Sequence, residues 1–350
     1  MLPLINNTAK VKQVNVELVK TALKSLQFGT KLTIANATGL SVATCGTILN
    51  DLLARGEVIE ADLEQSGGGR PARRFMYNAN YAYIACIYVS NEGGIHRIVQ
   101  VIANLMGEII EEKLSEVESI NHAAIDKIIE TLLCKFENIK AIGIGVPGVI
   151  HKGVIIACDI GELVGLSLAG WLKAKYSLPV TVENDMNLIT YGFYKKQNYD
   201  EDKTVTVITF PRNVCSGAGI IIDGRIFRGN TNFAGEVSYL PFKCSRKEQV
   251  KLTNSSDLFF PLMIKTMVSI IAIINPETIV ITGNLIRLDM ADDIYNICEA
   301  MIPQGHMPRI IIQENMQADY IHGLISISLE SLTCDFQLVE KNSKVSTSSM

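Results

Sequence analysis

Apolar positions near the N-terminus recur every three or four residues, which is the spacing of helices that bury one face. A first run of this kind is stopped by Gly29, and a second covers residues 32–38. Gly39 then allows a tight turn, and Ser41 can cap a third helix that runs to about Arg55. The pattern predicts three short helices, of which the second and third form a helix-turn-helix.

The third of these helices has two faces of different character. Cys45 and Ile48 lie on an apolar face that can pack against the preceding helix, where Ala35 is small enough for a close crossing. Gly46 costs this helix about 1 kcal/mol relative to Ala. The other face is small and polar, so it can approach base edges in the major groove of DNA. We expect four residues of this face to bind DNA: Ser41, Ala43, Thr44 and Thr47. An ordinary helical hairpin is the alternative for this segment.

A glycine-rich segment, residues 65–71, joins two β-type runs at residues 57–60 and 74–77. Its glycines let the backbone approach a partner, its proline stiffens the exit, and its arginine fits the negative potential of a narrow A·T minor groove. Directly after a helix-turn-helix, such a hairpin is typical of a DNA-binding wing. We expect three residues of its tip to bind DNA: Gly69, Arg70 and Pro71.

The remainder of the chain alternates short apolar β-type runs with helical segments, which indicates an α/β body. The β-type runs are residues 83–89, 98–103, 141–146, 180–182, 205–209, 218–222 and 279–282. Two similar α/β halves are compatible with this order. The patterns predict three parts: a winged helix-turn-helix DNA-binding domain at residues 1–80, a body at residues 81–335, and a disordered Ser/Lys-rich tail at residues 336–350.

Composition and charge extend this picture. With 350 residues, 48% hydrophobic and 19% charged, the chain has the composition of a well-packed globular protein that needs no disulfides. Its eight cysteines form no CxxC unit, so we expect reduced thiols. Neither a signal peptide nor an apolar run of membrane-spanning length is evident, so we expect a cytoplasmic location and no membrane partner.

Residues 1–80 hold nine basic and six acidic residues, a balance of +3, so the rest sums to −7. A basic head on an acidic body favours a nucleic-acid partner for the head, although chance can also produce this imbalance.

Four segments of the body combine glycine with polar residues at strand ends, where open α/β sheets usually bind ligands. Asn, Asp and Glu side chains suit the hydroxyl groups of a sugar. The segments are residues 143–148, where a strand leads into a glycine turn, Glu183-Asn184-Asp185, residues 217–224, and Gly235-Glu236. For the second of these, the alternative is that Asp185 merely caps a helix that begins near Met186.

The order and spacing of these motifs, together with the wing, resemble the ROK family (repressors, open reading frames and kinases) from about Gln13 to Glu330. The resemblance implies a winged helix-turn-helix followed by a two-lobed actin/hexokinase-like (ribonuclease H-like) α/β body. It also implies sugar binding by Gly148, Asn184, Asp185 and Glu236, the aspartate being the catalytic base in the family's kinases.

Departures from the family pattern concern phosphate and metal. The GTGxGxG-like phosphate loop of ROK kinases reads Asn213-Val214-Cys215-Ser216-Gly217-Ala218-Gly219 here, and residues 89–94 lack the Asp-x-Gly-Gly-Thr motif. Bulkier side chains crowd the phosphate path and restrict the positive φ angles that glycine allows. At the family zinc site the His position is Tyr239, and of the cysteine cluster only Cys244 follows. We therefore expect no catalytic residue, no cofactor and no metal.

The sequence predicts a transcription repressor that binds a duplex DNA operator as a homodimer or higher homo-oligomer, responds to a small sugar and controls genes of sugar metabolism. Two alternatives stay open. One is an ATP-dependent sugar kinase, and the other is a DNA-binding dimer whose body senses no ligand.

Overall fold

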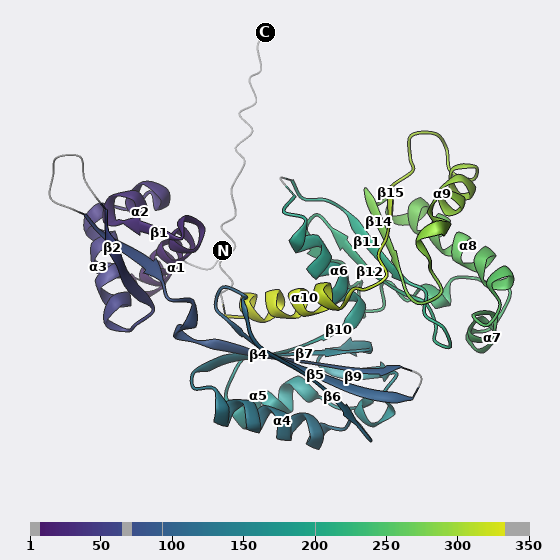
Figure 1. The fold of residues 1–350 in the computed structure, drawn as a ribbon, viewed down its shortest axis with the longest axis horizontal. Coiled ribbons are helices and arrows are strands. Elements are labelled where there is room, and N and C mark those ends of the chain that lie inside the picture. Colours follow the sequence, from purple (N-terminus) through teal and green to yellow (C-terminus); the bar gives the residue numbers. More distant parts are fainter. Residues whose placement is uncertain (1–7, 65–71, 93, 200, 333–350) are drawn as a thin grey trace, which may run out of the picture. The chain divides into compact units, whose positions relative to one another are not determined.

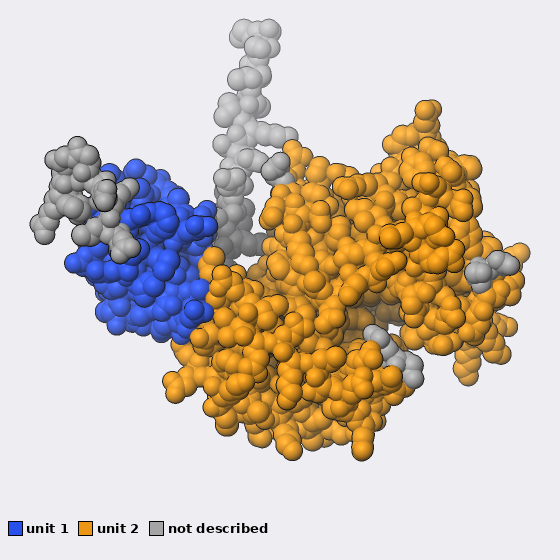
Figure 2. All heavy atoms as spheres, viewed as in Figure 1, with its two compact units in different colours: residues 1–81, 333–350 blue, residues 82–332 orange. Residues whose placement is uncertain are grey.

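The computed structural model describes residues 8–64, 72–92, 94–199 and 201–332 (Figure 1). The chain divides after Tyr81 into two compact units, here called the head and the body (Figure 2). The predicted wing-tip residues Gly69, Arg70 and Pro71, and the predicted tail at residues 336–350, lie outside the described residues.

The head combines three helices with a small antiparallel sheet. The helices are α1 (Thr8–Leu26), α2 (Lys31–Thr38) and α3 (Val42–Ala54). The sheet has the order β1-β3-β2, with β1 (Phe28–Thr30), β3 (Ala72–Tyr77) and β2 (Val58–Glu64). Ile34, Leu49 and Phe75 are fully buried where helices and sheet meet. The short β1 was not predicted, because a single three-residue strand leaves no alternation to detect.

The turn between α2 and α3 has the geometry expected of a helix-turn-helix. Gly39 ends α2 with a φ of 71°, and its N–H donates to the carbonyl of Ala35. Ser41 caps α3, its hydroxyl accepting a hydrogen bond of 3.0 Å from the N–H of Thr44. The two helices are bent by 113°, within the range of about 90–120° seen in helix-turn-helix units.

The body holds two five-stranded sheets of the same topology. The first has the order β6-β5-β4-β7-β10, and the second β13-β12-β11-β14-β15. Each sheet with its helices is here called a lobe, the first built on β4 and the second on β11. In both lobes the first three strands along the chain pair antiparallel, and the last two join the sheet in parallel. The first set is β4 (Tyr83–Glu92), β5 (Ile95–Asn104), β6 (Ile109–Val117), β7 (Ile139–Val146) and β10 (Val180–Asn184). The second set is β11 (Val205–Thr209), β12 (Gly217–Ile222), β13 (Arg225–Ile226), β14 (Thr278–Thr282) and β15 (Arg309–Ile312). The two α/β halves that the sequence left open are thus present.

Helices cover these sheets in layers (Figure 1). Helices α4 (His122–Lys135) and α5 (Leu168–Tyr176) pack on one face of the first sheet, beside the small hairpin of β8 (Gly148–His151) and β9 (Val154–Cys158). Helices α6 (Asp185–Lys196) and α10 (Gln317–Glu330) share a buried cluster with both sheets. The second sheet packs on α8 (Ser256–Ile274) and α9 (Ala291–Glu299), and the short α7 (Arg246–Leu252) precedes α8.

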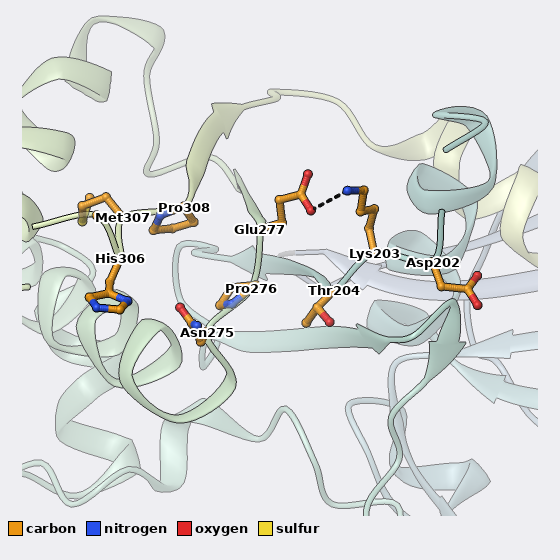
Figure 3. A pocket seen from close by; sticks show the side chains of 10 residues that line it. Asp202, Lys203, Thr204, Asn275, Pro276, Glu277, His306, Met307 and Pro308 are labelled. Carbon is orange, nitrogen blue, oxygen red and sulfur yellow. Dashed lines mark ion pairs between the residues drawn. The ribbon is translucent and has the colours of Figure 1, made fainter. Parts of the chain in front are cut away.

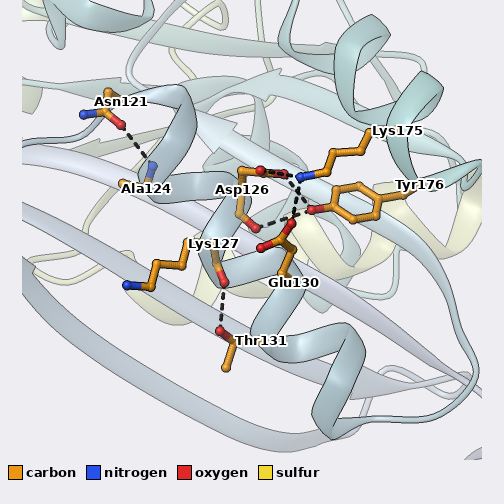
Figure 4. Close-up of polar contacts among 8 residues, drawn as sticks. All are labelled: Asn121, Ala124, Asp126, Lys127, Glu130, Thr131, Lys175 and Tyr176. Carbon is orange, nitrogen blue, oxygen red and sulfur yellow. Dashed lines mark hydrogen bonds and ion pairs between the residues drawn. The ribbon is translucent and has the colours of Figure 1, made fainter.

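Polar contacts join the two outer helices of the first lobe (Figure 4). Lys175 of α5 contacts Asp126 at 2.5 Å and Glu130 at 2.8 Å, both on α4. The hydroxyl of Tyr176 donates to the same Asp126 at 2.6 Å. These contacts fix α5, and with it the chain that enters β10.

Among the described residues, no single helix has the length and apolar character needed to cross a membrane; the bent pair α2 and α3 meets those two criteria only when taken together.

Helices α6 and α10 touch backbone to backbone. A methyl group at Gly192 would collide with the carbonyl of Asp319, and one at Gly323 would collide with the carbonyl of Leu188. Neither backbone can retreat, since both helices are buried between the two sheets. The two glycines therefore set how closely the helices approach.

Replacing Gly192 by alanine is expected to destabilise the body by about 3 kcal/mol or more, because the added methyl group overlaps backbone in a packed interior. Urea unfolding of the full chain measures this. The matched control is Gly170→Ala, an exposed position of α5 where only the movable hydroxyl of Ser167 lies close. There the better helix propensity of alanine should leave stability unchanged or raise it by up to about 1 kcal/mol. Equal effects of the two substitutions would contradict the role of the helix crossing.

Candidate functional site

The candidate site forms where β10 ends and α6 begins. Asn184 is the N-cap of α6, and its side-chain oxygen accepts a hydrogen bond of 3.1 Å from the N–H of Asn187. Its amide nitrogen donates to the carbonyl of Gly148 at 3.0 Å. The structure thus brings Gly148 and Asn184 together. It also corrects the alternative for this segment, because the cap is Asn184 rather than Asp185.

Asp185 is the first residue of α6 and is partly exposed. One carboxylate oxygen accepts the N–H of Met186 at 2.8 Å. Burial of the carboxyl among protein atoms raises its pKa to about 7; the Met186 hydrogen bond opposes this shift, and the nearby charges of Asp159 and Glu236 add to it. Asp185 therefore lies near two other acidic groups, and the Met186 hydrogen bond offsets their effect on its pKa only in part.

Glu236 comes from the second lobe. It follows Gly235, which has a φ of 93° and lies so close to the carbonyl of Ala218 that a methyl group would not fit. Burial raises the pKa of Glu236, Arg246 lowers it, and Asp159 raises it further. Glu236 also acts electrostatically on Asp185, so Asp185 after β10 and Glu236 after Gly235, whose carbonyl accepts the N–H of Ala218 on β12, lie near one region.

Two charged residues in this region were missed by sequence reasoning. Asp159 follows β9, and its N–H donates to the carbonyl of Pro147 at 3.0 Å. Although Asp159 is exposed over much of its surface, the protein around its carboxyl raises its pKa, and Arg246 lowers it. Arg246 opens α7. In the sequence, Asp159 directly follows the short β-type run that became β9, and this position at a strand end could have indicated it. No comparable signal existed for Arg246.

Glu183 has a different role from its neighbours. It is 6% exposed, and one oxygen accepts hydrogen bonds from Arg228 at 2.9 and 2.6 Å. The other oxygen accepts the amide of Asn187 and the N–H of Asn184, both at 2.9 Å. A buried carboxylate paired in this way is fixed, and loss of its partner typically costs about 3–5 kcal/mol. Glu183 thus supports Asn184 and is not free to bind a ligand.

Residues 143–148 were predicted as a strand that leads into a glycine turn, and the structure has a strand to Val146 followed by a bend at Pro147. Strand β7 continues to Val146, and its glycines serve packing. A side chain at Gly143 would meet Ser328, and one at Gly145 would meet the ring of Tyr320, both on α10. Glycine is needed here for the close approach of a helix to the sheet.

The segment that matches a phosphate loop, residues 213–219, is held at its first residue and at the residue before it by hydrogen bonds within the chain. The N–H of Arg212 donates to the side chain of Asn284 at 2.6 Å, and the N–H of Asn213 donates to the hydroxyl of Thr253 at 3.0 Å. Asn213 adopts a φ of 62°, which asparagine tolerates better than most residues. Residues 89–92 belong to the ladder between β4 and β5.

In the head, the predicted DNA-binding residues occupy the first turns of α3. Ala43 and Thr47 are exposed, whereas the hydroxyls of Ser41 and Thr44 contact each other at 2.8 Å within the helix cap. Asn50, three residues beyond Thr47, is exposed on the same face and was not predicted. Its spacing from Thr47 was the signal that could have identified it.

A separate cavity of about 400 Å³ lies at the opposite ends of the second-lobe strands (Figure 3). Thr204, Glu277 and Pro308 line it, each directly preceding a strand, and Lys203 pairs with Glu277 at 3.1 Å. Ligands of such sheets usually bind at the carboxyl ends of strands, where Asp185 lies. Within the described part of the chain, no group of three or more His, Cys, Asp or Glu side chains could hold a metal ion.

The part of the chain that carries this site is similar to a known protein family. The model of the ROK family matches residues 88–250, which include β10, Asp185 and Glu236. The match covers a little under half of the chain, and over these residues it confirms the resemblance to the ROK family that was inferred from the sequence.

The xylose repressor of Caldicellulosiruptor bescii is 27% identical over 246 residues, which are 67% of this chain and 60% of that repressor. This chain therefore spans less than two thirds of that relative.

Two solved structures share the fold. A ROK family transcriptional regulator, described as a homologue of the E. coli MLC protein, has a TM-score of 0.65 at 17% identity and covers 92% of this chain and 97% of its own. A ROK family glucokinase from Streptomyces griseus, in complex with glucose and AMPPNP, has a TM-score of 0.55 at 14% identity, over 71% of this chain and all of its own. The predicted fold class of the ROK body is confirmed.

Replacing Asp185 by asparagine is expected to stabilise the protein at pH 8 by about 1–3 kcal/mol, less than the roughly 4 kcal/mol limit for a shift from 3.8 to about 7, because the residue is partly exposed. A raised folded-state pKa means that the folded protein binds the proton more tightly than the unfolded chain. The penalty of the charged carboxyl is therefore complete above pH 7 and disappears as the pH falls towards 4.

Urea unfolding of wild type and Asp185→Asn at pH 8 and pH 5 tests this expectation. The advantage of the variant should shrink at pH 5. A difference that is the same at both pH values would show that the Asp185 carboxyl does not titrate in this range.

Proposed function

We propose that this protein is a transcription repressor of the ROK type, whose head binds a duplex DNA operator and whose body binds a small sugar without transferring phosphate. The observation that carries the proposal is the presence, in one chain, of a helix-turn-helix head and a ROK body that retains Asn184, Asp185 and Glu236. The name of the xylose repressor relative supports a role in sugar metabolism. The proposed place of action is the cytoplasm.

The exposed face of α3 suits the major groove. Ala43 and Thr47 are small, and the amide of Asn50 can pair with adenine. A single helix-turn-helix reads few bases, and dimers place two recognition helices about one turn of DNA apart. We therefore propose a homodimer or a higher homo-oligomer, with Gly69, Arg70 and Pro71 of the wing entering the minor groove.

The body site supports sugar binding through its arrangement of acceptors. Asp185 and Glu236 are partly exposed and approach one region from two lobes, and Asn184 holds the adjoining turn. Several directed polar groups of this kind can bind the hydroxyls of one small molecule. If the ligand favours the DNA-free state, its differential affinity sets the effect on operator binding, typically about 1–3 kcal/mol.

The contacts near Asn213 argue against a kinase. Phosphoryl transfer depends on positioning phosphates and Mg²⁺, and phosphate loops do so with free backbone N–H groups. Here the N–H groups of Arg212 and Asn213 donate to side chains of this chain. Asp185 would then bind a sugar hydroxyl without acting as a catalytic base.

Arg70→Ala is expected to weaken operator binding by about 1–3 kcal/mol and to relax the preference for A·T-rich flanks, because the guanidinium would leave the minor groove. Gel-shift titration against an operator selected from a random DNA pool measures both effects. The control is Arg55→Ala at the other end of α3, where the arginine pairs with Glu57 at 3.1 Å. Unchanged affinity and preference in the Arg70 variant would refute the role of the wing.

Asp185→Ala is expected to abolish the effect of sugar on operator binding while leaving operator affinity without sugar intact. The probes are D-xylose and D-glucose, titrated against the complex of full-length protein and operator. The wild type should release DNA in the presence of one of them. If neither sugar changes operator binding or gives calorimetric heat with the wild type, the sugar-responsive part of the proposal fails.

A further inference from the structure

Arg246 is held beside the site by two side-chain hydrogen bonds and by a contact with an aromatic ring. Its Nε donates to the hydroxyl of Ser238 at 3.2 Å, and its Nη1 donates to the hydroxyl of Tyr239 at 3.0 Å. The guanidinium also lies 4.6 Å from the ring centre of Tyr239. Nη2 takes part in neither of these two hydrogen bonds; burial lowers the pKa of Arg246, whereas the neighbouring Cys215 thiol, which also hydrogen-bonds the guanidinium, raises it. The arginine is thus bonded to side chains that lie two and three residues after Glu236 in the sequence.

Ser238 itself is firmly placed. It is 2% exposed, and its carbonyl accepts the amide of Gln249 at 2.9 Å. Because Gln249 and Arg246 both lie on α7, the start of this helix and the turn that carries Glu236 form one unit. Arg246 therefore keeps a defined position relative to Glu236.

Asp159 is placed on the other lobe by its N–H, which donates to Pro147 beside Gly148. Asp159 acts electrostatically on Asp185, Glu236 and Arg246, so all four charges lie near one another. Yet no ion pair of 4.0 Å or less joins Arg246 or Asp159 to any described residue. Arg246 and Asp159 are thus not paired with each other, and each can bind a polar group of a ligand.

A buried hydroxyl adds independent support. Tyr320 is only 7% exposed, stacks on Tyr88 at 4.3 Å, and its hydroxyl has no hydrogen-bond partner among the described residues. Asp185 is the charge that acts on it most strongly. Buried polar groups are rarely left without a partner, so a hydroxyl in this position points to a missing donor or acceptor at the base of the site.

We propose that Asp159 and Arg246 are further ligand-binding residues of this site, with Asp159 accepting a hydrogen bond from one sugar hydroxyl and Arg246 donating to a sugar oxygen on the opposite side. This inference rests on the proposed sugar-binding function. The pair selects sugars by which hydroxyl groups they carry, since a sugar that lacks one of the two bonded groups leaves a charge without its partner.

The experiment compares Asp159→Asn, Arg246→Gln and the double variant with wild type, by calorimetric titration with D-xylose and D-glucose and by gel shift with operator DNA. The matched control is Asp289→Asn and Arg287→Gln, an exposed Arg–Asp pair of the same body with a contact of 3.0 Å. Each single variant at the site should bind the preferred sugar about tenfold more weakly, a loss typical of a charged hydrogen bond, and change the ratio between the two sugars. Operator affinity without sugar should stay within about twofold, and the control variants should behave as wild type.

The outcomes separate this inference from the function on which it rests. If wild type binds neither sugar and operator binding does not respond, the proposed sugar response fails, and this inference with it. If wild type binds a sugar but Asp159→Asn and Arg246→Gln bind it equally well and with the same selectivity, the inference is overturned and the proposed function stands. Should Arg246→Gln fold poorly, the exposed and isosteric Asp159→Asn decides the question alone.

Discussion

The backbone contact between α6 and α10 is the constraint on which the rest of the body depends. Since Gly192 and Gly323 carry no side chains, the two helices touch directly, and each also touches a sheet through further glycines. Gly143 and Gly145 bring β7 against α10, and Gly219 brings β12 against α6. The N-terminus of α6, where Asn184 and Asp185 lie, is thereby positioned against both lobes by contacts that leave little room for adjustment.

This constraint explains why glycine-rich motifs were misleading as indicators of ligand loops. A glycine that permits close packing looks the same in sequence as one that cradles a phosphate. The two uses differ in what the neighbouring N–H groups do. In this protein the strand glycines face helices, and the loop N–H groups near Asn213 are already bonded to Asn284 and Thr253. The polar site depends instead on side chains at strand ends.

Much of the fold follows from local pattern, and the failures have physical causes. The predicted runs locate β4, β5, β7, β10, β11, β12 and β14, because their alternating or continuous apolar residues are buried. Strand β6 was missed because it lies at a sheet edge and carries four charged residues, with most of its side chains exposed. Asn184, Asp185 and Glu236 could be proposed from motif order alone. Arg246 could not, since it approaches Glu236 only through the fold of α7 on Ser238.

The contrast between two arginines shows how charge divides into support and recognition in this body. Arg228 is bonded to the buried Glu183, where both charges are satisfied and the pair holds β10 in place. Arg246 and Asp159 are also held, but by neutral groups, so their charges remain available. Because Asp159 and Asp185 belong to one lobe, and Glu236 and Arg246 to the other, a ligand bonded to all four would add attraction between the lobes. Such a ligand favours whichever lobe arrangement brings the four groups together, and this differential affinity is the only means by which it can bias the protein between states.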